Sequence, residues 1–186
     1  MIPRVVVLCE GMIRRDGKIV LEAHSSSTLV DCGDRRIVVD TSTPTYRCKV
    51  IEGLQREGVA PGSVSMVVIT HAHHDHEGNN DLFSRARVVV FAGEGRMGEE
   101  TVLAEGVRLV RTPGHTPESA SVFVDAEKKY AIVGDAIPTE DNYLKWVPPR
   151  ANYDAGKALE SMRRIVDFAD VIVPGHGPAF EVKKIS

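Results

Sequence analysis

The chain has 186 residues, a formal net charge of −3, 42% hydrophobic residues and 26% charged residues. This length fits one domain that can bury a core without disulfides or a structural metal. Some basic residues occur in pairs, but these pairs are scattered along the chain, and phosphate contacts need clustered Lys and Arg. We therefore do not favour a nucleic-acid partner.

The first forty residues predict short strands joined by hairpin turns. Apolar or β-branched runs occupy residues 5–9, 19–23, 28–32 and 36–40. Asp16-Gly17 and Gly33-Asp34 lie between these runs, and both pairs are typical of tight turns. This pattern favours antiparallel hairpins in the N-terminal part of the chain.

The rest of the chain alternates between strand and helix patterns. Helical periodicity predicts helices over residues 46–57 and 156–168, although Gly53 weakens the first of them. Residues 64–70 are continuously apolar and β-branched, which indicates a strand buried on both faces. Further strands are expected over residues 88–91, 107–110, 120–124, 130–133 and 171–173. The order predicts one α/β domain over residues 1–186, with sheets packed face to face and helices outside.

The cysteines and the N-terminal residues indicate the cellular compartment in which the protein is expected. Cys9, Cys32 and Cys48 form no C-x-x-C pattern, and any single pairing leaves one thiol over. This is typical of a reduced protein, so we expect a cytoplasmic location. The apolar run at residues 5–9 is too short for a signal peptide or a membrane span, so no membrane association is expected.

One hexapeptide carries four side chains of the kinds that bind metals. His71, His73, Asp75 and His76 follow directly after the apolar run that ends at Thr70. At a strand end, alternate residues point the same way, so His71 and His73 can converge on one ion. Imidazole and carboxylate groups suit zinc, iron and manganese. The pattern H-x-H-x-D-H arises by chance in about one in a thousand such chains, so it strongly indicates a metal site.

Three further candidate ligands stand at later strand-to-loop boundaries. His115 lies in a T-P-G-H-T-P segment, Asp135 in G-D-A and His176 in P-G-H-G. Glycine or proline flanks each one and can hold a short loop in a special backbone geometry. Ligands at stiff strand ends are better positioned than ligands on long loops.

The order H-x-H-x-D-H, T-P-G-H, G-D-A and P-G-H-G resembles the metallo-β-lactamase superfamily, over residues 40–178. The resemblance implies an αββα four-layer sandwich, in which two mixed β-sheets are flanked by helices and the metals lie at one sheet edge. It also implies two divalent metal ions. We expect zinc, with manganese or iron as alternatives.

The matching motifs assign each ligand. Three histidines would hold the first metal: His71, His73 and His115. Three residues would hold the second: Asp75, His76 and His176. Asp135 would bridge both ions, and Asp40 would support a ligand histidine by a hydrogen bond, which fixes the ring tautomer.

Departures from individual relatives narrow the expected activity. The best-known β-lactamases use a cysteine where this chain has Asp135, so antibiotic hydrolysis is not expected as the main activity. The extra C-terminal helices of glutathione-thioester hydrolases and the large insertion of nucleic-acid-processing relatives have no counterpart. The chain is expected to be a compact, stand-alone member.

The ligand set predicts a metal-dependent hydrolase. Two adjacent cations lower the pKa of a bridging water, which gives hydroxide at neutral pH. Asp75 and Asp135 are the expected catalytic residues, and Asp75 or a water that it orients would protonate the leaving group. The expected substrate is an ester, thioester or phosphodiester of a small molecule.

Other functions and assemblies stay open. One alternative is a mononuclear iron oxygenase acting on a sulfur compound, and others are a metal-dependent ribonuclease or phosphodiesterase and a binding protein with an inert site. Compact relatives often pair, so a homodimer is a candidate assembly, although no segment identifies an interface.

Several residues near the motifs have more than one candidate role. We expect His74 to be solvated and His24 to be an ordinary loop histidine, with the alternative that His24 reaches the mouth of the site. A further group follows the Asp135 loop and could clamp a substrate: Tyr143, Lys145, Trp146 and Arg150. An equal alternative for Trp146 is packing under the turn at residues 148–149.

Overall fold

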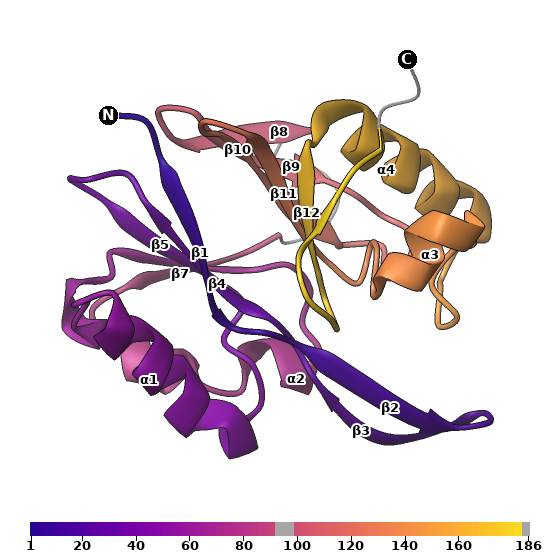
Figure 1. Cartoon of the computed structure of the whole chain (residues 1–186), viewed down its shortest axis with the longest axis horizontal. Helices are drawn as coiled ribbons and strands as arrows, with labels where there is room; N and C mark the ends of the chain where they lie inside the picture. Colours follow the sequence, from indigo (N-terminus) through magenta and orange to yellow (C-terminus); the bar gives the residue numbers. More distant parts are fainter. Residues whose placement is uncertain (92–98, 184–186) are drawn as a thin grey trace.

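The computed structural model describes residues 1–91 and 99–183, and two β-sheets packed against each other dominate it (Figure 1). The first sheet has the order β1 (Arg4–Cys9), β4 (Ser27–Asp31), β5 (Arg36–Val39), β6 (Met66–Ile69) and β7 (Arg87–Val90). Within it, β5, β6 and β7 are parallel and the other pairs are antiparallel. This sheet is therefore mixed.

The second sheet is also mixed. Its order is β13 (Phe180–Glu181), β12 (Val171–Pro174), β11 (Lys129–Gly134), β10 (Ala120–Asp125), β9 (Val107–Arg111) and β8 (Glu100–Ala104). Only β11 and β12 pair in parallel among its described strands. The four α-helices of the described residues are α1 (Arg47–Arg56), α2 (His74–Glu77), α3 (Glu140–Lys145) and α4 (Ala155–Phe168). Short 3₁₀ turns cover Pro44–Tyr46, Pro61–Ser63 and Asn80–Phe83.

Three apolar layers hold this arrangement together. Between the sheets lie side chains such as Val39, Leu109 and Val122. A second layer joins α1 to the outer face of the first sheet, and a third joins α4 to the outer face of the second. The expected αββα sandwich is confirmed. Strand β6 is buried on both faces, as its continuous apolar run predicts.

Gly53 has a clear structural reason within α1. A Cβ atom at this position would lie 2.4 Å from the carbonyl oxygen of Leu8 in β1. The helix therefore approaches the sheet more closely than any larger residue allows, which offsets the low helix propensity of glycine.

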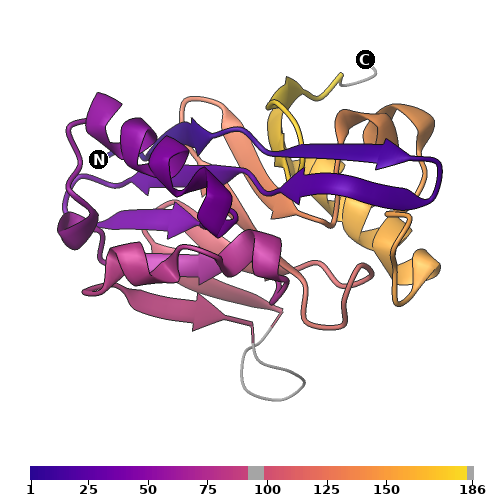
Figure 2. The ribbon, with the colours of Figure 1, turned by 90° about the horizontal axis from the view of Figure 1, so that it is seen from below.

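A two-stranded hairpin, β2 (Met12–Asp16) and β3 (Ile19–His24), stands apart from both sheets. It extends toward the side of the molecule that holds α3 and α4 (Figures 1 and 2). At its tip, the guanidinium of Arg150 donates a hydrogen bond to the carbonyl of Gly17 over 2.8 Å. No helix in the described ranges is both long and apolar enough to cross a membrane.

Candidate metal centre

The first sheet supplies one half of the centre at the end of β6. His71 follows Thr70 immediately after this strand, and His73 is the N-cap of the short helix α2. Asp75 and His76 lie in the first turn of α2. The hexapeptide therefore spans a strand end, a tight turn and a helix start, which aims its side chains at two neighbouring points.

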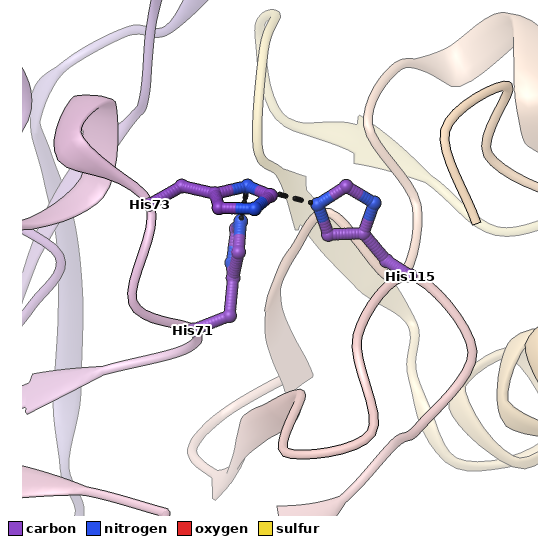
Figure 3. Close-up of side chains that lie close together, drawn as sticks. All are labelled: His71, His73 and His115. Atoms are coloured by element: carbon purple, nitrogen blue, oxygen red, sulfur yellow. Dashed lines mark hydrogen bonds between the residues drawn. The ribbon is translucent and has the colours of Figure 1, made fainter. Parts of the chain in front are cut away.

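The second sheet supplies the other half from the loops after β9, β11 and β12. These loops carry His115, Asp135 and His176 respectively. Figure 3 shows His115 reaching His71 and His73 from the opposite side. Gly114 makes this approach possible because its φ is +141° and a Cβ there would lie 2.3 Å from Cα of Ala158 in α4.

Three histidine nitrogens converge at the first position. Nε2 of His71 and Nε2 of His115 lie 2.9 and 3.1 Å from Nδ1 of His73. Two nitrogens bound to one tetrahedral zinc ion lie about 3.4 Å apart, given a Zn–N distance of about 2.1 Å. The three donor atoms all lie within 4.8 Å of one another, so they fit a single metal ion.

The second position is formed by Asp75, His76 and His176, whose donor atoms also lie within 4.8 Å of one another. Nε2 of His176 is 3.6 Å from Oδ2 of Asp75. Both histidines are buried, whereas the Asp75 side chain keeps 27% of its surface exposed. Asp75 is therefore the carboxylate of this group that solvent can reach.

Asp135 stands between the two positions with one oxygen toward each. Its Oδ2 lies 3.6 Å from Nε2 of His115, on the first side. Its Oδ1 lies 3.5 Å from Nε2 of His76 and 3.2 Å from Nε2 of His176, on the second side. This orientation fits a carboxylate that bridges two ions.

Buried polar atoms in this centre support the same interpretation. Within residues 1–91 and 99–183, Nε2 of His76 and Oδ1 of Asp135 make no hydrogen bond of acceptable geometry. Leaving such atoms unpaired is costly, and native structures rarely do so without a ligand, water or ion. Both atoms point into the second donor group, so the residues present fit a metal there.

The ring nitrogens that face away from the centre have partners of their own. Nδ1 of His115 lies 2.6 Å from the carbonyl of Ala151, and Nδ1 of His176 lies 2.9 Å from the carbonyl of His24. A carbonyl only accepts, so each ring must place its proton on Nδ1 and leave a lone pair on Nε2 for a metal.

For His76, the partner of the ring nitrogen that faces away from the centre is a carboxylate. Oδ2 of Asp40 lies 2.7 Å from Nδ1 of His76 and accepts a hydrogen bond from the Thr70 hydroxyl. The same hydroxyl is 3.2 Å from Nδ1 of His71. The expected supporting role of Asp40 therefore matches its contacts. The contributions of the Ala151 and His24 carbonyls carry no sequence signal, because backbone carbonyls belong to every residue, and the Thr70 hydroxyl lies outside the quoted motifs.

The two positions differ electrostatically in the metal-free protein. Burial lowers the pKa of His71 and of His73, and neighbouring histidines lower both further. Burial also opposes protonation of His76, but Asp40 and Asp135 outweigh it and raise its pKa to about 10. For His176, Asp135 likewise outweighs burial and raises the pKa. At pH 7 the His71 and His73 rings are therefore neutral, whereas the His76 ring holds a proton.

Asp135 responds to the same environment. Burial alone would raise the pKa of this carboxyl, but the His176 and His76 rings beside it hold the pKa well below its usual range. The group is thus a carboxylate at any physiological pH, which is the form that binds metal ions.

The two remaining histidines differ from each other. His74 is exposed on α2, as expected. His24 is not a loop histidine: it ends β3 and is 3% exposed. Burial lowers the pKa of its ring, which stacks on Tyr46. Only its backbone carbonyl contacts the centre, so a prediction from side-chain chemistry missed its role.

The candidate substrate clamp after Asp135 is not built as expected. Tyr143 stacks on Phe180, and Lys145 forms an exposed ion pair with Asp141 within α3. Trp146 lines a groove beside α4 whose described walls include none of the metal-centre residues. Arg150 donates to the hairpin tip. None of these described contacts involves a residue of the candidate metal centre.

Comparison with known proteins agrees with the ligand geometry. The model of the metallo-β-lactamase superfamily matches residues 21–96 and 96–176. The metallo-β-lactamase domain-containing protein 1 of Xenopus laevis is 37% identical over 97% of this chain and 82% of its own length. The chain belongs to the metallo-β-lactamase superfamily. A relative from Methanocaldococcus jannaschii, named as a metallo-hydrolase, is 34% identical over 92% of this chain and 86% of its own.

Solved structures share the fold of this superfamily member. A Thermotoga maritima protein assigned to the metallo-β-lactamases has a TM-score of 0.79 at 22% identity, covering 97% of this chain and all of its own. An N-acyl homoserine lactone hydrolase has a TM-score of 0.67 at 20% identity, covering 89% of this chain and 86% of its own. These likenesses show the shared fold, and the family match with the curated relatives identifies the chain as a metal-dependent hydrolase.

Proposed function

We propose that this protein is a dinuclear hydrolase that cleaves an ester, thioester or phosphodiester of a small molecule. The orientation of Asp135 carries this proposal, because its two oxygens face two separate donor groups. A protein that used one metal would need only the first group. Zinc suits this set of nitrogen and carboxylate donors, with manganese or iron as alternatives.

The metal ions would supply the reactive groups, and the surrounding residues would hold the ligand rings in place. Two bound cations supply Lewis acidity and a hydroxide nucleophile at neutral pH. The carbonyls of Ala151 and His24 and the carboxylate of Asp40 hold the ligand rings in one tautomer. A centre fixed in this way needs little rearrangement during the reaction.

Asp75 is the residue placed to handle a proton. Its side chain is partly exposed at the edge of the second group, whereas Asp135 is more deeply buried between the groups. A carboxyl at the edge can meet a leaving-group oxygen directly or through one water. We propose that Asp75 accepts the proton that the attacking hydroxide gives up and passes it to the departing alcohol or thiol.

The substrate class is a small molecule rather than a nucleic acid. One fold neighbour is described as a lactone hydrolase, and a lactone is a cyclic carboxylic ester. The Arg150 guanidinium is committed to the Gly17 carbonyl instead of being presented to a phosphate. Carboxylic esters, lactones included, are therefore the first substrates to assay, followed by thioesters and phosphodiesters.

The deciding experiment is the metal content per chain, measured by elemental analysis on protein purified without chelator or added metal. We expect two equivalents of metal in the wild type and one in His76→Ala, because His76 belongs to the second group. His74→Ala is the matched control: it removes an exposed histidine from the same helix and should keep both equivalents.

Hydrolysis is assayed on the same three proteins. We expect wild type and His74→Ala to hydrolyse one substrate class at equal rates and His76→Ala to lose most of that activity. One equivalent of iron in the wild type, together with oxygen uptake on thiol or persulfide substrates, would overturn the proposal in favour of an oxygenase.

A further inference from the structure

Residues 24–26 join β3 to β4 at the root of the hairpin, and we name this segment the clasp. All three residues are buried: His24 is the last residue of β3, and Ser25 and Ser26 connect it to β4. A buried connection must satisfy its backbone polar groups inside the protein. The backbone partners of the clasp lie in helix α2, which carries Asp75, and in the loop that carries His176.

On one side the clasp holds the helix that carries Asp75. The backbone N–H of Ser25 donates to the backbone carbonyl of Asp75 over 3.1 Å. This contact joins the hairpin root to the first turn of α2, so it fixes the backbone from which the Asp75 carboxylate extends.

On the other side the clasp holds the loop that carries His176. The carbonyl of His24 lies 2.9 Å from Nδ1 of His176. The N–H of Ser26 donates to the carbonyl of Gly175 over 2.8 Å, and its hydroxyl donates to the carbonyl of Gly177 over 3.4 Å. The residue before His176, the His176 ring and the residue after it thus all contact the same short segment.

The clasp is itself firmly anchored. The His24 ring stacks on Tyr46 with centroids 3.4 Å apart, and its Nε2 lies 3.1 Å from the carbonyl of Glu10. The N–H of Gly11 donates to the Ser26 hydroxyl. The first metal position is held differently, since Nδ1 of His115 donates its hydrogen bond to the Ala151 carbonyl in another loop.

We propose that the clasp positions the ligands of the second metal and sets the affinity of that metal without affecting the first. This inference rests on the proposed dinuclear function. His24, Ser25 and Ser26 act as positioning residues, because they contact the ligands or their neighbours and not the metal. Removing such outer contacts typically weakens metal binding about 10–100-fold.

Gly11→Ala is the sharpest test of the clasp. A Cβ at this position would lie 2.2 Å from the Gly175 carbonyl oxygen and 2.5 Å from the Ser26 nitrogen, so it must push apart the clasp and the His176 loop. Gly62→Ala is the matched control, because its Cβ would have only Arg85 Cδ nearby, at 3.9 Å. Metal-depleted protein is titrated with zinc against a competing chelator, and the two dissociation constants are fitted separately.

We expect Gly11→Ala to raise the dissociation constant of the second zinc about tenfold or more and to leave the first within about twofold. Gly62→Ala should match the wild type. If both zinc ions bind more weakly to the same extent, or if neither binding constant changes, the proposed role of the clasp is wrong. If the wild type binds only one zinc, the dinuclear proposal itself is wrong.

A milder variant decides the matter if Gly11→Ala does not fold. Ser26→Ala removes the hydroxyl contacts to Gly11 and Gly177 and keeps the backbone bond to Gly175. We expect a smaller weakening of the second zinc alone, about threefold. Ser63→Ala, which removes an exposed hydroxyl bonded to Ala60, is its control. An unchanged second constant in Ser26→Ala, with the melting temperature of the metal-free protein also unchanged, contradicts the proposal.

Discussion

Nδ1 of His76 lies 2.7 Å from Oδ2 of Asp40, and both side chains are buried. The other oxygen of Asp40 accepts the backbone N–H of Thr70, so the carboxylate cannot turn away from the ring. The pair fixes the direction of His76 Nε2, the atom that faces Asp135. Asp40 is also one of the few non-glycine residues with a positive φ, +54°, a strained conformation of the kind that clusters at functional sites.

Asp40→Asn tests this pair with little change in shape. Asparagine tolerates the left-handed backbone conformation, but its amide removes the negative charge beside His76. We expect the affinity for the second metal to fall about 10–100-fold, with the first metal bound as in the wild type. Zinc titration against a chelator measures both constants.

Asp81→Asn is the matched control for Asp40→Asn. It removes a carboxylate that forms an exposed ion pair with Arg47 and has no described side-chain contact with a candidate metal ligand. Its zinc constants should equal those of the wild type. An Asp40→Asn protein that binds the second zinc normally would show that the carboxylate does not support His76.

The metal affinities of the two positions should depend differently on pH. In the metal-free protein the pKa of His76 is raised to about 10, so at pH 7 this ring holds a proton that a metal must displace, and the raised pKa of His176 adds to this competition. As pH rises toward 10, fewer protons compete and the second metal binds more tightly, by up to about tenfold per pH unit for each displaced proton.

Protons compete less for two ligands of the first position, His71 and His73. The pKa values of His71 and His73 are lowered below 6.5, so these rings are already neutral at pH 7. We expect the first zinc constant to stay level between pH 7 and 9 while the second improves. Calorimetry in buffers of different ionisation enthalpy counts the protons released by each zinc. Equal release in both steps would contradict the electrostatic difference.

Asp75→Asn tests the proposed proton delivery. The amide oxygen can still serve as a ligand, but the side chain can no longer transfer a proton. With excess metal, we expect full occupancy and a kcat lowered about 100-fold. Glu77→Gln, on the same helix, should keep its kcat. Unchanged turnover in a fully loaded Asp75→Asn protein would remove Asp75 from the mechanism.

The candidate ligands can be predicted from the sequence because the chemistry of the site depends on side chains at strand ends. His71, His115, Asp135 and His176 each follow directly or closely after a strand of apolar residues. The supporting shell was less predictable. The carbonyls of Ala151 and His24 act through the backbone, and only the folded chain shows which carbonyl meets which ring.

The missed elements share a physical cause. Strands β2 and β8 were not expected because they contain exposed and charged residues, including Arg14, Arg15 and Glu100, and lack a buried alternating face. Helix α3 has no buried residue, so its sequence carries no apolar stripe. Its capping box at Thr139 and Asn142 starts the helix instead. That helix sets where Tyr143, Lys145 and Trp146 point, which is why their roles could not be inferred.

Gly134→Ala tests how closely the two sheets approach beneath the metal centre. Gly134 precedes Asp135 with φ at +49°, and a Cβ there would lie 2.2 Å from Oγ1 of Thr70. Alanine would add left-handed backbone strain and a steric clash, each of which costs about 1–3 kcal/mol. We expect the free energy of unfolding of the metal-free protein to fall by about 3 kcal/mol, measured by urea denaturation.

The same substitution should also disturb the centre, because the Thr70 hydroxyl contacts Asp40 and His71. Gly62→Ala, whose Cβ meets open space apart from Arg85, should stay within about 0.5 kcal/mol of the wild type. A loss below about 1 kcal/mol in Gly134→Ala would mean that the Thr70 and Asp135 loops relax together at little cost. The close contact between the sheets would then not be what fixes Asp135 between the two donor groups.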